Sequence, residues 1–375
     1  MGEQIMKAVV TGAKGFIGKN LCERLKSIDA MTVCPFDVDT DPALLSEYVR
    51  DADIIYHLAG VNRPQDQSEY MEGNCGFTRT LLDAIAASCN TKATLVMSSS
   101  IQAELDNPYG RSKLAGEDLV RSFAEEKGIH SVIYRFPNVF GKWCRPNYNS
   151  VVATFCNNIA RDLPILVDDP DKILHLVYID DVIEELLLCL TGHEHVSEGF
   201  GYVQDVYDVD LGMIPQLLYT FRETRRDLTL PDFTDEFEKK LYSTYLSYLP
   251  ENDFSYPLDM HEDERGSFTE FIKTPERGQV SVNISHPGII KGNHWHNTKN
   301  EKFLVVSGEG LIRLRRVGTE DVIEYRVSSK ELTVVDIPCG YVHSIENVGQ
   351  TDMATVMWVN EVFDPNNSDT YREEV

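Results

Sequence analysis

The stretch KAVVTGAKGFIG, residues 7–18, decides the fold of the first half of the chain. A short apolar run leads into three glycines, Gly12, Gly15 and Gly18, and a helical pattern follows directly. The first glycine permits a tight turn, the second lets a pyrophosphate approach the backbone, and the third allows close helix packing. The N-terminus of the following helix then faces the anion. The stretch predicts a dinucleotide-binding site, although a glycine triplet alone would also fit an ordinary strand-to-helix turn.

Four further apolar segments follow, with helical patterns between them. They are TVCPF, DIIYHLAG, ATLVMSS and SVIYRF, all before residue 137. Continuous apolar runs of this length are typical of parallel strands that are buried on both faces. The alternation predicts an α/β domain with a Rossmann-type doubly wound parallel sheet. We expect this domain to span residues 1–250, with residues 137–250 shaping a substrate pocket.

The residue composition and the hydrophobic pattern of the sequence change after about residue 250. The runs GQVSVNIS, EKFLVVSGEGLIRLRRV, ELTVVDIP and MATVMWV are rich in β-formers and are separated by glycine, asparagine and proline turns. This pattern predicts an all-β barrel or jelly roll over residues 251–375.

The amino-acid composition limits the classes of molecule that the chain is expected to bind. A formal net charge of −25 argues against nucleic acid, because binding a phosphate backbone needs a basic surface. The eight cysteines form no CxxC pair, which is typical of a reduced, cytoplasmic protein. We expect no signal peptide and no membrane insertion, because the first residues lead straight into the glycine loop and the apolar runs are short.

An acidic residue follows the second predicted strand. Asp37 stands nineteen positions after Gly18, where a carboxylate typically binds the adenosine ribose hydroxyls and favours NAD. An exposed turn aspartate is an equal alternative, because Asp39 and Asp41 follow immediately.

A tyrosine and a lysine with helical spacing follow a run of three serines. Tyr109 and Lys113 are four positions apart, which places them on one helix face. A neighbouring ammonium stabilises a phenolate, whose pKa is about 10 when unperturbed. Such a tyrosine can exchange a proton with a carbonyl oxygen while hydride moves at carbon. Ser100 would hold that oxygen, and Ser99 is the alternative if the register slips by one.

Four potential metal ligands stand in the second half of the chain. His294 and His296 alternate on one predicted strand, Glu301 begins the next, and His343 belongs to a distant one. Three imidazoles and a carboxylate suit zinc, with iron, nickel or manganese as other candidates, and leave coordination positions open. The alternative is a set of histidines satisfied by hydrogen bonds in the core.

The N-terminal motifs resemble the extended short-chain dehydrogenase/reductases that act on nucleotide sugars. The resemblance rests on the glycine loop, HLAG at 57–60, the serine run, YxxxK and RFPNVFG at 135–141. It implies Tyr109 as acid/base, Lys113 as its modulator and nicotinamide-ribose ligand, and Ser100 as carbonyl anchor. It also places Phe16, Ile17 and Ala59 at the cofactor and Asn138 at the substrate. Dehydratases of this family carry Asp-Glu where Ile101 and Gln102 stand here, so the resemblance favours reduction or epimerisation.

The C-terminal motifs resemble those of the cupins. Upstream of them, DERGSFTE at 263–270 resembles a motif of the nucleotide-linked 4-keto-sugar 3,5-epimerases. That resemblance implies substrate contacts from Arg265, Phe268 and Glu270, and a plain β-turn is the alternative. His294 falls near the catalytic base of those epimerases yet is assigned here to the ion, so the identity of the base stays open.

Taken whole, the chain resembles the bifunctional capsular-polysaccharide enzymes of the CapF type, most specifically in GKWCRPNYNSVVATFC (141–156) and KGNHWHNTKNEKFLVVSG (291–308). The resemblance implies C3 epimerisation of a UDP-linked 4-keto-6-deoxy amino sugar in the cupin domain, then C4 reduction to UDP-N-acetyl-6-deoxy-L-talosamine, for capsule or O-antigen synthesis. It also implies NADPH, although Asp37 favours NADH, a zinc ion and a homodimer. Two alternatives are a redox-neutral NAD-dependent epimerase with a structural cupin and a non-enzymatic metal-dependent sugar-nucleotide sensor.

Overall fold

The computed structural model of the protein describes residues 5–274, 276–364, 366 and 368–375. The chain forms two compact units. The first comprises Met1–Tyr219 and Phe233–Pro250, and the second comprises Thr220–Asp232 and Glu251–Val375. The predicted domain limits, 1–250 and 251–375, differ from these units in the placement of residues 220–232.

A seven-stranded sheet in the order β2-β1-β3-β4-β5-β9-β8 forms the centre of the first unit. Its first five strands are parallel, which confirms the predicted doubly wound sheet. The strands are β1 (Met6–Thr11), β2 (Met31–Phe36), β3 (Ile54–His57), β4 (Thr94–Ser100), β5 (Ser131–Phe136), β8 (Val196–Ser197) and β9 (Phe200–Gly201). Strands β2 and β3 lie on opposite sides of β1, so the strand order reverses at β1, beside the glycine loop. Doubly wound α/β sheets bind their ligands at such a reversal.

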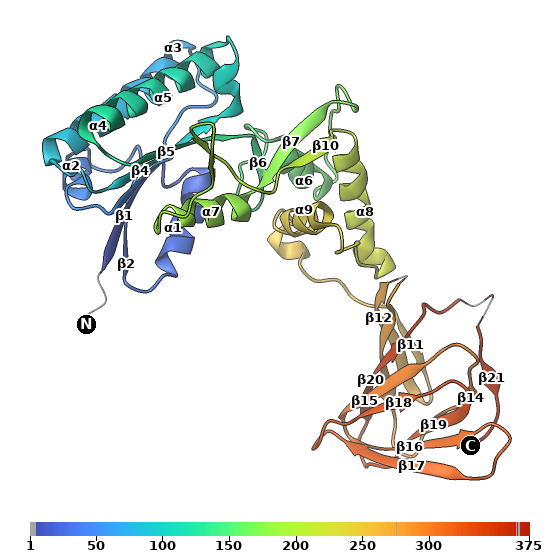
Figure 1. Cartoon of the computed structure of the whole chain (residues 1–375). Helices are drawn as coiled ribbons and strands as arrows, with labels where there is room; N and C mark the ends of the chain where they lie inside the picture. Colours follow the sequence, from blue (N-terminus) through green and yellow to red (C-terminus); the bar gives the residue numbers. More distant parts are fainter. Residues whose placement is uncertain (1–4, 275, 365, 367) are drawn as a thin grey trace. The chain divides into compact units, whose positions relative to one another are not determined.

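Helices cover both faces of this sheet (Figure 1). Helices α1 (Phe16–Lys26) and α7 (Ile179–Leu188) pack on one face, in a core that includes Val10. The other face is covered by α2 (Ala43–Val49), α4 (Phe77–Ser88) and α5 (Pro108–Lys127), in a core that includes Val9. Successive strand residues point to opposite faces, and both are fully buried, which explains the unbroken apolar runs in the sequence.

The remaining elements of the first unit include a three-stranded sheet in the order β10-β7-β6. Its strands are β6 (Asn138–Phe140), β7 (Ile173–Tyr178) and β10 (Tyr207–Asp210). The further helical segments along the chain are α3 (Ser68–Tyr70), the π-helix η1 (Met71–Gly76), the 3₁₀ segments η2 (Ile101–Glu104) and η3 (Glu251–Asp253), α6 (Val151–Ile159), α8 (Met213–Asp227) and α9 (Glu236–Leu246). Of these, η3 and the end of α8 group with the second unit.

Two antiparallel sheets form the second unit, which confirms the predicted cupin-type jelly roll. One sheet has the order β11-β12-β13-β20-β15-β18 and the other β17-β16-β19-β14-β21. The strands are β11 (Met260–Asp263), β12 (Gly266–Thr274), β13 (Gly278–Ser285), β14 (Ile290–Trp295), β15 (Glu301–Ser307), β16 (Glu309–Arg316), β17 (Val322–Ser328), β18 (Val334–Ile337), β19 (Tyr341–Asn347), β20 (Met353–Val359) and β21 (Tyr371–Arg372). Phe303 and Val305 of one sheet and Ile312 and Ile345 of the other share one buried core.

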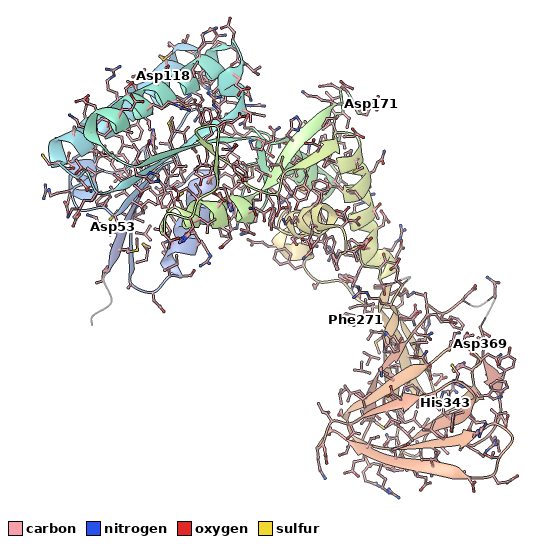
Figure 2. The ribbon with its side chains drawn as sticks, viewed as in Figure 1. Asp53, Asp118, Asp171, Phe271, His343 and Asp369 are labelled. Atoms are coloured by element: carbon pink, nitrogen blue, oxygen red, sulfur yellow. The ribbon has the colours of Figure 1, made fainter. Side chains whose placement is uncertain are left out.

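Figure 2 shows the side chains of both units, with His343 and Asp369 labelled in the second. Among the helices of the described residues, none combines the length and the apolar composition that a bilayer crossing requires.

Candidate active site and metal centre

The glycine loop connects β1 to α1 in the geometry that the sequence predicts. Gly12 has a φ of 67°, and a Cβ on it would lie 2.7 Å from the backbone of Ala59. A Cβ on Gly18 would lie 2.1 Å from the Gly12 carbonyl oxygen, so only glycine fits at either position. Gly15 caps α1 without a side-chain hydrogen bond. The first turn of α1 therefore keeps backbone N–H groups that can bind an anion.

Asp37 and Lys14 meet at the end of β2. One carboxylate oxygen of Asp37 accepts a hydrogen bond from the Lys14 backbone N–H at 2.7 Å, and the other accepts from Val38 N–H at 2.8 Å. The Lys14 ammonium forms an exposed ion pair with Asp39. Lys14 was not among the predicted site residues, because it reaches the end of β2 from the glycine loop, 23 positions before Asp37 in the sequence.

Tyr109 lies in the first turn of α5. The helix begins there because the Asn107 side chain accepts a hydrogen bond from Gly110 N–H and Pro108 starts the first turn. Burial raises the pKa of Tyr109 to about 12, and a hydrogen bond with Ser100 acts in the opposite direction. The Lys113 ammonium lies 5.9 Å from the Tyr109 ring centroid and donates to the Ser98 carbonyl at 3.4 Å, so its predicted role in stabilising a phenolate stays a prediction.

Lys113 links the tyrosine to the cofactor loop. Its side chain is buried, and burial lowers the pKa of its ammonium to about 8, with Glu117 acting in the opposite direction. A Cβ placed on Gly60 would lie 3.0 Å from the Lys113 nitrogen. Because Ala59 in turn lies next to Gly12, the predicted lysine and the predicted glycine loop both lie beside the two-residue segment Ala59–Gly60.

The two serine candidates have different surroundings. The Ser99 hydroxyl donates to Glu117, at 2.5 Å, and Glu117 is also held by the Arg135 guanidinium at 2.7 Å. Ser99 is therefore committed to a buried ion pair, and Ser100 faces Tyr109. Asn138, the predicted substrate contact, begins β6, where its amide donates to the His175 carbonyl at 3.5 Å.

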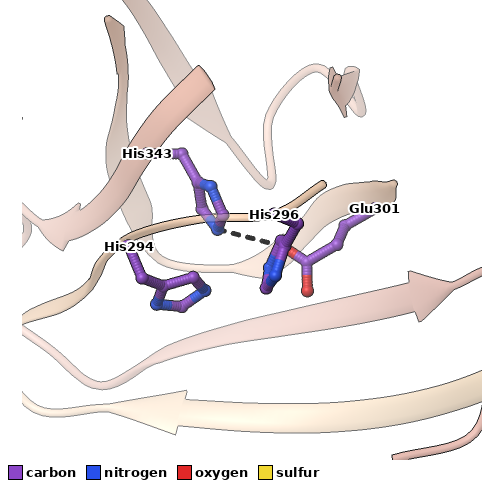
Figure 3. Close-up of side chains that lie close together, drawn as sticks. All are labelled: His294, His296, Glu301 and His343. Carbon is purple, nitrogen blue, oxygen red and sulfur yellow. Dashed lines mark ion pairs between the residues drawn. The ribbon is translucent and has the colours of Figure 1, made fainter. Parts of the chain in front are cut away.

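In the second unit, the four predicted metal ligands come together (Figure 3). His294 comes from β14, His296 directly follows that strand, Glu301 opens β15 and His343 lies in β19. One ligand atom from each residue lies within 4.8 Å of the others. The pairing of β14 with β19 sets His294 opposite His343, which explains how strands far apart in the sequence meet here.

The inner atoms of this cluster fit a cation. The Nε2 atoms of His296 and His343 and the Oε2 atom of Glu301 are buried and lack a hydrogen-bond partner among the described residues. Glu301 Oε2 lies 3.0 Å from His343 Nε2 and 3.9 Å from His296 Nε2. Buried polar atoms are normally satisfied, so three that converge without a partner are the arrangement expected of metal ligands.

The protonation states of the side chains in the cluster also suit a bound cation. Burial lowers the pKa of His294, and together with the neighbouring His343 and His296 it brings that pKa to about 4. Burial alone would raise the pKa of Glu301, yet its contact with His343 and the nearby imidazoles bring it below the ordinary value. At neutral pH the site therefore offers a neutral imidazole and a carboxylate, the forms that bind metals.

A cavity of about 480 Å³ opens beside these ligands. Two of the predicted substrate contacts, Phe268 and Glu270, lie in its wall together with three of the ligands. The third, Arg265, is exposed outside the wall and pairs with Asp263 at 2.6 Å, which matches the β-turn alternative. The cavity wall also contains residues that the sequence did not predict, from several strands and from the C-terminal segment: His261, Gln279, Ser281, Lys299, Met357, Val359, Glu361, Phe363 and Thr370.

Comparisons with known proteins cover the whole chain. Residues 8–203 match the NAD dependent epimerase/dehydratase family, and residues 261–371 match the polysaccharide biosynthesis C-terminal domain. The UDP-2-acetamido-2,6-beta-L-arabino-hexul-4-ose reductase of Pseudomonas aeruginosa is 43% identical over 367 residues, which are 98% of each protein.

Solved structures agree with this result. The crystal structure of the capsular polysaccharide assembling protein CapF from Staphylococcus aureus has 56% identity and a TM-score of 0.93, over 99% of this chain and 100% of that one. A structure of CapF with the inhibitor 3-isopropenyl-tropolone has 51% identity and a TM-score of 0.88 over the same shares. Agreement of sequence and fold over the full length shows that the chain belongs to the CapF family, with an N-terminal part of the NAD dependent epimerase/dehydratase family.

Proposed function

We propose that the chain is an NAD(P)H-dependent reductase of a UDP-linked 2-acetamido-2,6-dideoxy-hexos-4-ulose. One observation carries the proposal: a relative named for this reduction is 43% identical over 98% of the chain. The hydrogen bond between Ser100 and Tyr109 and the closeness of Lys113 to the cofactor loop support it.

The side chains of the first unit have separate roles in this reaction. NAD(P)H supplies a hydride to C4 of the sugar. Tyr109 donates its proton to the C4 oxygen, and a pKa of about 12 keeps the phenol protonated and ready to act as the acid. Ser100 holds the same oxygen by a hydrogen bond. The Lys113 ammonium favours the phenolate that forms after transfer, and it holds the nicotinamide ribose.

We further propose that the second unit epimerises C3 of the same ketone. A carbonyl at C4 makes the C3 proton acidic, because the resulting charge delocalises onto the oxygen. A divalent ion, proposed to be zinc, would be held by His294, His296, Glu301 and His343 and would act as a Lewis acid. Epimerisation must precede reduction, because reduction removes the carbonyl on which the acidity of C3 depends.

The base for this step is proposed among the titratable groups of the cavity wall. His261, Glu270 and Glu361 line the cavity together with the ligands, and none of them belongs to the ligand set. Each can be replaced in turn by glutamine, which does not act as a base, and the variant tested for loss of C3 deuterium exchange. The base is the residue whose replacement removes exchange while the metal content stays unchanged.

NADPH is the proposed cofactor. Lys14 supports this choice, because its ammonium lies next to Asp39 and its backbone next to Asp37, at the edge where the adenosine ribose of a bound dinucleotide is expected. We also propose that the chain acts as a homodimer.

One experiment tests both activities. The ketone sugar nucleotide is incubated in D₂O with NADPH or NADH, with and without a chelator, and C3 deuterium and cofactor oxidation are followed by NMR and absorbance. We expect exchange at C3 to stop when the metal is removed, while a ketone supplied already epimerised is still reduced. Turnover without net cofactor oxidation would instead show a redox-neutral epimerase, and binding without turnover would show a sensor.

A further inference from the structure

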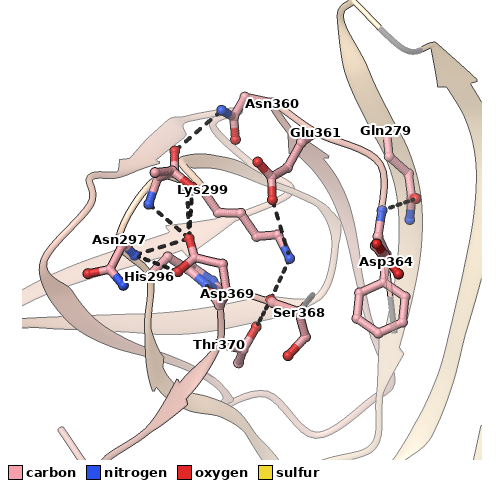
Figure 4. Close-up of polar contacts among 12 residues, drawn as sticks. Gln279, His296, Asn297, Lys299, Asn360, Glu361, Asp364, Ser368, Asp369 and Thr370 are labelled. Carbon is pink, nitrogen blue, oxygen red and sulfur yellow. Dashed lines mark hydrogen bonds and ion pairs between the residues drawn. The ribbon is translucent and has the colours of Figure 1, made fainter. Parts of the chain in front are cut away.

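The short segment between two of the proposed metal ligands is held by a residue from the C-terminal end of the described chain (Figure 4). Residues 297–300 connect His296 to Glu301. Both carboxylate oxygens of Asp369 face this segment. They accept hydrogen bonds from the backbone N–H groups of Asn297 at 3.1 Å, Thr298 at 2.8 Å and Lys299 at 3.2 Å. The Thr298 hydroxyl adds a fourth donor at 3.0 Å.

The backbone of Asp369 also contacts a ligand directly. Its carbonyl oxygen accepts a hydrogen bond from Nδ1 of His296 at 2.5 Å. A histidine that donates from Nδ1 carries its lone pair on Nε2, which is the atom that faces Glu301 and lacks a hydrogen-bond partner among the described residues. The contact therefore selects the tautomer that a metal needs.

Further contacts tie the rest of this segment, residues 368–375, to the same sheet. Strand β21 pairs with β14, and the ring of Tyr371 stacks on Trp295 with centroids 4.6 Å apart. The Arg315 guanidinium donates to the Glu373 side chain at 2.7 Å and to the Glu374 carbonyl at 2.6 Å. Together with the contacts of Asp369, these contacts hold both ends of residues 368–375 next to β14, the strand that carries His294.

One contact joins the segment to the cavity. The buried Lys299 ammonium donates to the Ser368 carbonyl at 2.6 Å and lies 3.6 Å from the Glu361 carboxylate. Lys299, Glu361 and Thr370 all line the cavity beside the ligands. The segment thus shapes the wall that a substrate would touch as well as the segment that carries the ligands.

We propose that residues 368–375 act as a strap that positions the metal ligands, with Asp369 as the positioning residue. This inference rests on the proposed metal site. The strap keeps His296 in the tautomer and orientation that the ion requires, and it holds residues 297–300 so that Glu301 reaches the same ion. Metal affinity, and not only activity, depends on Asp369.

Zinc affinity of the full-length chain tests the strap. Affinity is measured by competition with a chelating dye for the wild type, Asp369→Ala, Asp369→Asn and the control Asp364→Ala. Loss of a residue that hydrogen-bonds to a metal ligand typically weakens metal binding by about 10–100-fold. We expect a loss in that range for Asp369→Ala and a smaller loss for Asp369→Asn, which keeps one acceptor oxygen. Asp364→Ala should bind like the wild type, because the exposed Asp364 carboxylate accepts a hydrogen bond from the Asn366 backbone N–H and not from residues 297–300.

The absorption spectrum of the cobalt-loaded protein provides a second readout, because its band shape reports ligand geometry. We expect the spectrum to change in Asp369→Ala and to stay unchanged in Asp364→Ala. Should the alanine variant fail to fold, Asp369→Asn carries the comparison. Unchanged zinc affinity and an unchanged cobalt spectrum in a folded Asp369 variant would overturn the strap while leaving the metal site intact. A wild-type chain that binds no divalent metal would overturn the metal site and the strap together.

Discussion

The two candidate sites of this chain are built in opposite ways. The Tyr109 and Lys113 pair comes from one turn of α5, and its serine partners end the strand just before it. The histidine cluster draws two ligands from β14 and the residue after it, one from β15 and one from the distant β19. It also depends on a further residue, Asp369, that is 26 positions beyond His343. A site assembled from local spacing can be read from the sequence, whereas a site assembled by sheet pairing needs the fold to explain its geometry.

The largest effect is expected from removing the proton donor of the first site, which should abolish one activity and leave the other. Replacing Tyr109 by phenylalanine removes the acid that completes reduction, and loss of a general acid typically costs about 10²–10⁴-fold in rate. We expect oxidation of NADPH by the ketone to fall by that amount. Deuterium exchange at C3 should continue at the wild-type rate, since the histidine cluster is untouched. Loss of both activities in a folded variant would contradict the assignment of two independent sites.

A complementary change addresses the histidine cluster. His296→Ala removes a ligand and should weaken zinc binding by more than about 100-fold, beyond the range typical of residues that only hydrogen-bond to a ligand. C3 exchange should fall with the zinc content, measured by metal analysis, while an already epimerised ketone is still reduced. His286→Ala is a matched control, because His286 is exposed and pairs with Asp352. If metal-free protein exchanged C3 at the normal rate, the ion would have a structural role only.

The pH dependence of reduction tests the lysine of the first site. Burial lowers the pKa of Lys113 to about 8, so its ammonium is charged at pH 7 and loses its proton as the pH rises through 8. We expect kcat/KM for reduction to fall above pH 8, about tenfold per pH unit at the limit. Lys113→Met should be slower at all pH values and should lack this decline. The same alkaline decline in the methionine variant would assign it to another group.

Stability should change in the opposite direction over this range. An unfolded lysine keeps its proton up to a pKa of about 10.4, so between pH 8 and 10 the unfolded state binds more protons at this position than the folded state. The contribution of Lys113 to the free energy of unfolding therefore rises with pH in this window. A fall in reduction rate at constant or higher melting temperature would separate titration of Lys113 from alkaline unfolding.

The smallest expected effect concerns the choice of cofactor. Lys14→Ala should lower the preference for NADPH over NADH by about tenfold, the scale of one hydrogen bond to a charged group at an exposed position. The measurement is the ratio of kcat/KM for the two cofactors. Lys19→Ala serves as the control, since the Lys19 ammonium lies over the Trp143 ring instead. An unchanged ratio in Lys14→Ala would leave NADPH without support from this lysine.

Both fold classes could be predicted from the sequence because their periodicity is strong and local. The glycine loop, the buried apolar runs and the alternation of the β-rich segments each depend on a few neighbouring residues. The ligand residues could also be named, because histidines and a glutamate in that spacing are specific. Lys14, Lys299 and Asp369 could not be predicted, because each gains its place through a contact between segments distant in sequence. Arg265 pairs with its neighbour Asp263 in the structure, and its contact with substrate stays a prediction.

The three consecutive serines at the end of β4 have a consequence for mutational libraries. Ser98 offers its carbonyl to Lys113, Ser99 gives its hydroxyl to Glu117, and Ser100 turns toward Tyr109. The three identical residues therefore lie in three different environments. In a library that randomises all three codons, survivors at position 99 would be selected by expression level and survivors at position 100 by turnover. Position 98 would tolerate any small side chain, because its contribution comes from the main chain.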